Sequence, residues 1–347
     1  MRKRTLIPLL IAVILLCALG AMLYLRANAP PEAARLLPES DAIVFINLKA
    51  VRAVTHFDQS PIERSPDFQQ FIDATGIVPE RDLDSVALAL HRMSDPNGPN
   101  GPVAYSEIFI GRFDGVRLAQ YLHSIATGEE SYAGRTIYTI PVGEPAGRHL
   151  RIAQLGYDVI AASNMPTPEQ IHSMLDRSRA SALATPGSSL LAARFHDVPL
   201  LSQAWGIGHI GLPFSQAGHI SLFGLDLPLS ADTDLVASLR YNGAAHLLTG
   251  GAVHLRIEEI APDAASAQNT VDALTTLLNI FRGVASERPA HTDADTAFRA
   301  VLDSVKLTQH DDRALLNATA SLDQLKALAS AHNPTTDPAP ASPHPSK

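Results

Sequence analysis

Glycines spaced like a dinucleotide-binding fingerprint stand at residues 205–211, where the chain reads WGIGHIG. A working G-x-G-x-x-G motif lies between a strand and a helix, because the N-terminus of that helix faces the pyrophosphate. After Gly211, however, Pro213 and Gly218 follow closely, and both residue types disfavour a helix. We therefore expect a strand with small residues at alternate positions, leading into a Gly-rich loop, and we predict no cofactor.

The chain has 14 histidines, but none has H-x-H, H-E-x-x-H or another tight metal-ligand spacing. His209 and His219 flank the loop that follows Trp205, the only tryptophan of the chain. We take Trp205, His209 and His219 as ligand-contact candidates and assign no metal ligand.

Catalytic motifs of the common hydrolase classes are absent from the sequence, which has no G-x-S-x-G elbow, S-x-x-K or Walker loop. The acid pair Glu258-Glu259 lies in a predicted strand, where adjacent side chains point to opposite faces, so it is a poor acid–base pair. No catalytic residue is assigned. The alternative is a periplasmic hydrolase or metalloenzyme with dispersed residues, drawn from His209, His219, His254 and Glu258.

The N-terminus has the pattern of a membrane anchor. Residues 5–25 are uncharged and apolar, and a helix of this length spans the roughly 30 Å core of a bilayer. Arg2, Lys3 and Arg4 precede the run and only Arg26 follows it, which predicts a cytoplasmic N-terminus and a body in the periplasm or outside. A cleaved signal peptide is the alternative, although its apolar region is usually shorter, about 7–15 residues. The single cysteine, Cys17, lies inside this run.

Behind the anchor, strands and helices alternate in an α+β pattern with mainly antiparallel sheets. Residues 85–92 and 252–260 place apolar residues at every second position, as half-buried strands do. Ser65-Pro66 predicts a helix start and Gly76 its end. A long helix from about Pro262 carries an apolar stripe from Ala267 to Phe281.

An internal match suggests a duplication. Residues 152–175 and 307–328 both predict a strand, a tight turn, a strand and a helix, with Gln154 aligned to Gln309. Each helix is predicted to start with a capping box, at residues 167–170 and 321–324. Any hairpin followed by a helix gives a similar pattern, so the match alone does not prove common origin. The expected organisation is: 1–29 cytoplasmic basic residues and transmembrane anchor, 30–38 stalk, 39–190 first α+β unit, 191–332 second unit, and 333–347 disordered Pro-rich tail.

The charge balance excludes one class of partner. The net charge is −8, and all four basic residues of the N-terminal segment precede an even more acidic body. Such a body repels phosphate backbones, so we predict no nucleic-acid binding. A lipid carrier requires a continuous apolar tunnel, whereas regular strand alternation favours filled cores.

Three segments together resemble uncharacterised bacterial membrane-anchored proteins, a group with a domain of unknown function: LPESDAIVFINLKAVR, FQQFIDATGIVPERDLDSVALAL and VKLTQHDDRALLNATASLDQL. The resemblance covers residues 36–330 in pattern and implies an N-terminal helix that tethers a duplicated α+β body. It implies no activity and no site residues. The sequence therefore favours a non-enzymatic binding or envelope-scaffold protein of the inner membrane, whose partner is an envelope protein or a small ligand.

Overall fold

The computed structural model describes residues 29–59, 64–143, 147–180, 187–209, 215–216, 219–222, 225–230, 233–243, 251–287 and 290–332. The predicted anchor and the Pro-rich tail lie outside these residues. Within the described ranges, no helix is both long and apolar enough to cross a membrane.

One sheet dominates the molecule. It has 12 strands in the order β14-β15-β13-β12-β8-β1-β2-β3-β7-β6-β5-β4, and every neighbouring pair is antiparallel. Its strands are β1 (Ala42–Ile46), β2 (Leu83–Arg92), β3 (Val103–Gly111), β4 (Gly128–Tyr132), β5 (Arg135–Pro141), β6 (His149–Gln154), β7 (Val159–Ser163), β8 (Ala204–Gly208), β12 (Asp234–Asn242), β13 (Ala252–Ile260), β14 (Lys306–His310) and β15 (Arg313–Ser321). A small second sheet contains β9 (Ser215–Gln216), β10 (His219–Leu222) and β11 (Leu225–Ser230).

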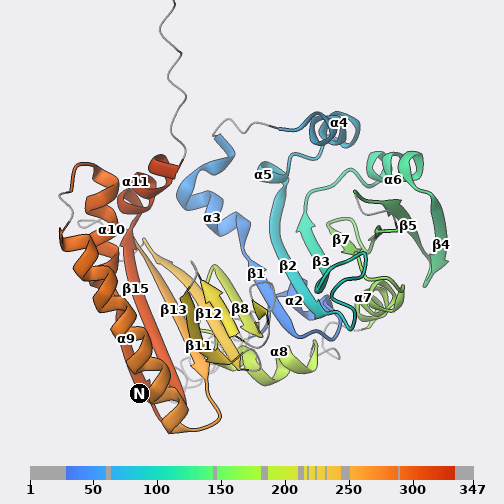
Figure 1. Ribbon diagram of the computed structural model, residues 1–347. Helices are drawn as coiled ribbons and strands as arrows, with labels where there is room; N and C mark the ends of the chain where they lie inside the picture. The colour runs from blue at the N-terminus through green and yellow to red at the C-terminus, as the bar shows by residue number, and fades with distance from the viewer. Residues whose placement is uncertain are drawn as a thin grey trace, which may run out of the picture.

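Helices cover both faces of the large sheet. They are α2 (Glu32–Leu36), α3 (Leu48–Thr55), α4 (Pro66–Thr75), α5 (Pro79–Asp82), α6 (Gly115–Ile125), α7 (Glu169–Arg179), α8 (Ser189–Arg194), α9 (Ala264–Glu287), α10 (Asp293–Ser304) and α11 (Leu322–His332), with 3-10 turns at η1 (Phe57–Gln59) and η2 (Phe195–Asp197). Figure 1 shows α9, α10 and α11 gathered at the β15 end of the sheet, and α4 and α6 near the opposite end. The prediction of an α+β fold with an antiparallel sheet packed by helices is confirmed.

Alternation along the strands divides the core between the two faces. Ile108 of β3 joins the main core with residues of α2, α7 and α8, and the next residue, Phe109, packs in a second core with α6. We call the face that carries Ile108, Phe45 and Trp205 the inner face, and the opposite one the outer face. On the outer face at the other end of the sheet, Val271 of α9 packs near Ala314 of β15.

Local signals placed several elements correctly. The Ser65 hydroxyl accepts a hydrogen bond from the Phe68 N–H at the start of α4, and Gly76 ends that helix at φ 73°. Ser321 and Gln324 form the predicted capping box of α11. The equivalent box predicted at Thr167 is wrong, because α7 has Pro168 at its N-cap and no side-chain cap.

Three other expectations need correction. Residues 30–38 are not a free stalk, because Ala33, Ala34 and Leu37 are completely buried in the main core. The composition of residues 286–295, SERPAHTDAD, predicts a loop. The segment instead contains the start of α10, where Thr292 and Asp295 form a capping box. The stripe of α9 is buried only in its first half, since Phe281 is 38% exposed.

Candidate functional site

A pocket of about 1090 Å³ opens on the inner face, where β1 and β8 meet the loop that follows α8. We call it the central pocket. Its volume is slightly above the roughly 300–1,000 Å³ found for ligand pockets. Besides Ala29, Pro30 and Pro31, its lining includes Phe45, Asn47, Leu191, Ala192, Phe195, His196, Asp197, Val198, Pro199, Leu200, Leu201, Ser202, Trp205, Arg256, Glu258 and Arg313.

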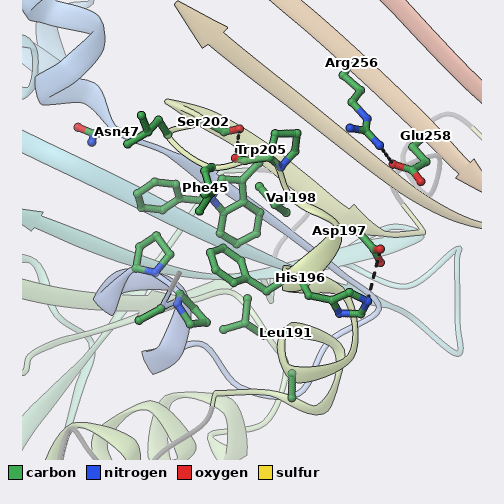
Figure 2. Close-up of a pocket in the computed structure, with 18 of the residues that line it drawn as sticks. Phe45, Asn47, Leu191, His196, Asp197, Val198, Ser202, Trp205, Arg256 and Glu258 are labelled. Atoms are coloured by element: carbon green, nitrogen blue, oxygen red, sulfur yellow. Dashed lines mark hydrogen bonds and ion pairs between the residues drawn. The ribbon is translucent and has the colours of Figure 1, made fainter. Parts of the chain in front are cut away.

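Three aromatic side chains, which we call the aromatic wall, line the pocket. Figure 2 shows two of them, Phe45 and Trp205, next to each other. Phe45 and Trp205 stack with ring centroids 5.5 Å apart, and Phe195 meets Trp205 edge-on at 5.4 Å. The stack follows from strand register, because Phe45 of β1 lies directly opposite Trp205 of β8. Trp205 is buried and 4% exposed, so the wall is preformed.

The two glycines of WGIGHIG that the structure describes belong to strand β8. Gly206 and Gly208 alternate with Trp205 and Ile207 in β8, and they pair with both β1 and β12. Gly208 has φ +95°, and a Cβ there would lie 2.4 Å from the Asp41 carbonyl oxygen. The glycines therefore permit a close approach of two backbones. The predicted strand is confirmed over Ala204–Gly208, whereas Gly211 lies outside the described residues.

Four charged side chains, which we call the charged end, also line the pocket. Arg256 donates to Glu258 at 2.6 Å, and Arg313 donates to both Glu258 at 2.6 Å and Asp197 at 2.8 Å. These hydrogen bonds raise the pKa of Arg313 above its ordinary value. The carboxylates are nearly enclosed, since the Glu258 and Asp197 side chains are 2% and 5% exposed. Figure 2 shows the Arg256–Glu258 contact.

The sheet fixes the distance between the aromatic wall and the charged end. Trp205, Ser238 and Arg256 lie in one row across β8, β12 and β13. Neighbouring strands are about 4.8 Å apart, so the backbones at Trp205 and Arg256 are separated by about 10 Å. The pocket thus presents an aromatic surface and a charged cluster at a fixed spacing.

The three ligand-contact candidates have different positions. Trp205 lines the central pocket, whereas His209 is not among the lining residues. His209 Nδ1 lies 3.4 Å from the Thr233 carbonyl oxygen and 3.4 Å from Asp234 Oδ1. His219 belongs to β10 of the small sheet, and its side chain lies outside the described part of the chain. A meeting of the two histidines stays a prediction.

The dispersed residues of the hydrolase or metalloenzyme alternative do not converge where they are described. His254 Nδ1 contacts the Thr319 hydroxyl at 3.2 Å, and Glu258 is held by arginines. The two residues are four apart on one strand, which separates them by about 13 Å. Among the described residues, no three His, Cys, Asp or Glu side chains are grouped closely enough to hold a metal ion.

The acid pair Glu258-Glu259 divides between the two faces as predicted. Glu258 points to the pocket, and Glu259 faces Thr270 of α9, where burial raises its pKa. Alternation along the strand therefore keeps these carboxylates apart.

A buried polar cluster was not foreseen from the sequence. His91 Nε2 lies 3.0 Å from the Ser106 hydroxyl, which is 3.0 Å from the Ser163 hydroxyl. Burial lowers the pKa of His91. A histidine beside a serine resembles a nucleophile with its base, but Ser106 is 0% exposed and a substrate does not reach it in this conformation. The cluster satisfies polar groups across β2, β3 and β7.

Most residues of the central pocket were also missed. Asp197, Arg256 and Arg313 come from distant segments, and only the sheet register and the turn after α8 bring them together. One sequence feature could have indicated the charged end. In the strand at residues 252–260, Arg256 and Glu258 share a face with His254.

Comparisons with known proteins add little. No protein-family model matches the sequence, and no curated protein is similar to it. Among solved structures, crystal form III of TP0453 is 13% identical with a TM-score of 0.46, over 87% of this chain and 99% of that one. Crystal form IV of TP0453 is 12% identical with a TM-score of 0.46, over 88% and 98%. A likeness of this size carries no argument about function.

Proposed function

We propose that the chain is a non-enzymatic binding protein, anchored in the inner membrane, that holds a small ligand in the central pocket outside the cytoplasm. The observation that carries this proposal is the pairing of a preformed aromatic wall with a charged end whose carboxylates are already bound by arginines. Apolar pockets with a few convergent polar groups are typical ligand sites. Carboxylates held in this way are poor general bases, because their oxygens already accept hydrogen bonds from arginine.

The anchor is the second part of the proposal. Residues 5–25 span the membrane, and the three preceding basic residues keep the N-terminus in the cytoplasm. The chain then enters the body at Ala29, Pro30 and Pro31, which belong to the pocket lining. If the anchor is inserted, we expect the ligand site to lie where the body meets its tether.

The two related units predicted from the sequence are the third part. Outward from the central pair β1 and β8, the strand order is β12-β13-β15-β14 on one side and begins with β2-β3-β7-β6 on the other, where β5 and β4 follow without a counterpart. Gln154 donates to the carbonyl of Gly156, and Gln309 donates to the carbonyl of Asp311, two residues further on in both cases. Matching order and matching side-chain bonds support a duplication about the β1–β8 pair, with boundaries at 39–190 and 191–332.

Native mass spectrometry of the full chain tests ligand binding. The protein is purified from membranes in a mild detergent and sprayed without denaturation. We expect a bound molecule that is lost when Ala192, an exposed residue of α8 that lines the pocket, is replaced by Phe. Ala193→Phe is the matched control, because Ala193 is exposed on the same helix and is not in the lining.

The result separates this function from its alternatives. A bare mass in all three proteins contradicts the ligand site and favours an envelope-scaffold role. A bound mass that survives Ala192→Phe but disappears in Ala193→Phe places the ligand elsewhere.

A further inference from the structure

We infer that the ligand of the central pocket is an anionic amphiphile, whose apolar chain lies on the aromatic wall and whose carboxylate or phosphate head meets Arg256 and Arg313. This inference rests on the proposed function and names its ligand class. A molecule that contacts both Trp205 and Arg256 is elongated, because the backbones that carry these residues are about 10 Å apart across the strands.

We infer the charge of the ligand's head group from which side chains of the charged end are exposed to solvent. The guanidinium-bearing side chains of Arg256 and Arg313 are 38% and 31% exposed, against 2% and 5% for Glu258 and Asp197. Each arginine has five N–H donors, and the hydrogen bonds to the two carboxylates engage one terminal nitrogen of each. Arg256 Nε and Asp197 Oδ2 are buried and have no hydrogen-bond partner within the described part of the chain. Arg313 Nε lies 4.0 Å from Asp312 Oδ1. The other terminal nitrogens of the two arginines are the donors that we expect an entering ligand to meet. Guanidinium donors of this kind bind carboxylates and phosphates.

The apolar part of the ligand follows from the rest of the lining. Pro30, Pro31, Leu191 and Val198 surround the aromatic wall. A hydrocarbon chain placed there is itself removed from water, and it covers the part of the lining that is still exposed. The charged end gives the pocket one place for a polar head group.

Three residues of the pocket lining, Ala29, Pro30 and Pro31, follow the predicted anchor closely in the sequence. The apolar run of the anchor ends at Leu25, four residues before Ala29 of the pocket lining. Four extended residues span at most about 14 Å, so the entrance stays close to the bilayer surface when the anchor is inserted. Leu200 and Leu201 of the lining are 46% and 76% exposed, and Leu201 has the uncommon φ of 63°. Exposed leucines next to a tether suit a site that receives amphiphiles from a bilayer.

The single tryptophan supplies a direct readout. Because Trp205 is the only tryptophan and lines the pocket, its emission reports on this site alone. The full chain is reconstituted in phosphatidylcholine nanodiscs and titrated with dibrominated stearic acid, whose bromines quench indole on contact. The methyl ester of the same acid is the uncharged control. We expect saturable quenching by the acid, at a concentration about tenfold or more below that needed for the ester.

Two further arms identify the source and the head-group site. Nanodiscs made with dibrominated phosphatidylglycerol, compared with dibrominated phosphatidylcholine, show whether the amphiphile comes from the bilayer or is free. The variant Arg256→Gln removes one guanidinium, leaves Glu258 bound to Arg313 and is expected to bind the acid about tenfold more weakly. Arg240→Gln is the matched control, because Arg240 faces the same side of the neighbouring strand outside the lining.

The outcomes separate the inference from the proposed function. Equal quenching by acid and ester overturns the anionic head, and this comparison needs no variant to fold. A bound mass in the native spectrum without quenching by any brominated probe overturns the amphiphile and leaves the binding function intact. If the native spectrum and the emission both show no ligand, the binding function itself is contradicted.

Discussion

Replacing Arg313 by Met tests the charged end of the pocket. Arg313 is the one residue that joins Asp197 to Glu258, with hydrogen bonds of 2.8 and 2.6 Å. Its loss leaves Asp197 Oδ1 without that partner and leaves Glu258 with Arg256 alone. Breaking a buried ion pair typically costs about 3–5 kcal/mol. Because Arg313 is itself 31% exposed and Arg256 stays in place, we expect the low end, about 3 kcal/mol.

The assay is a thermal melt followed by circular dichroism. For a domain of this size each kcal/mol lowers the melting temperature by about 2–4 °C, so Arg313→Met should lower it by about 6 °C or more. Arg240→Met makes the same change on the same face, away from the charged end, and should shift it by less than about 2 °C.

A combined variant separates charge burial from lost packing. Arg313→Met together with Glu258→Gln and Asp197→Asn removes the charges that the single change leaves unpaired. We expect it to recover part of the lost stability, because burying neutral polar side chains costs less free energy than burying unpaired charges. A loss below about 1 kcal/mol for the single change, as for exposed ion pairs, refutes the buried network.

Three further predictions concern the fold. Burial lowers the pKa of His91 from its usual 6.5, so the unfolded chain binds a proton that the folded chain excludes. The free energy of unfolding should stay constant above pH 6.5 and fall as the pH drops from there towards the folded-state pKa of His91. Urea unfolding at several pH values measures this fall, which should be smaller in His91→Gln. Gly208→Ala should lower the free energy of unfolding by at least about 2 kcal/mol. Gly101 has φ 70° and no neighbour within 4 Å, so Gly101→Ala should lower it by only about 1 kcal/mol. Equal melting temperatures of the two variants would contradict the close approach at β8. Thr292→Ala should cost about 1 kcal/mol through the lost cap of α10, and an unchanged melt would show that this cap is not formed.

Elements with a local signal could be predicted from the sequence. The alternation in β2 and β13, and the Ser65 and Gly76 boundaries of α4, depend on residues a few positions apart. The burial of α2 was missed because two alanines and a leucine between prolines give no periodic pattern. The start of α10 was missed because its capping residues, Thr292 and Asp295, resemble loop residues.

The site was harder to predict than the elements. Trp205 drew attention through its glycines, yet its role depends on Phe45, which is 160 positions away and lies opposite it in the register. The charged end joins three segments whose meeting depends on the strand order. His91 and Ser163 come together in the same way, across β3. Pairing between distant strands is set by the whole sheet and leaves no short motif.

The most direct measurement is a crystal structure of the full chain with dibrominated stearic acid, using the anomalous signal of bromine. Our account predicts bromine peaks on the aromatic wall, with the carboxylate within hydrogen-bond distance of Arg256 or Arg313. Bromine peaks only elsewhere, or an empty central pocket at saturating acid, contradict it.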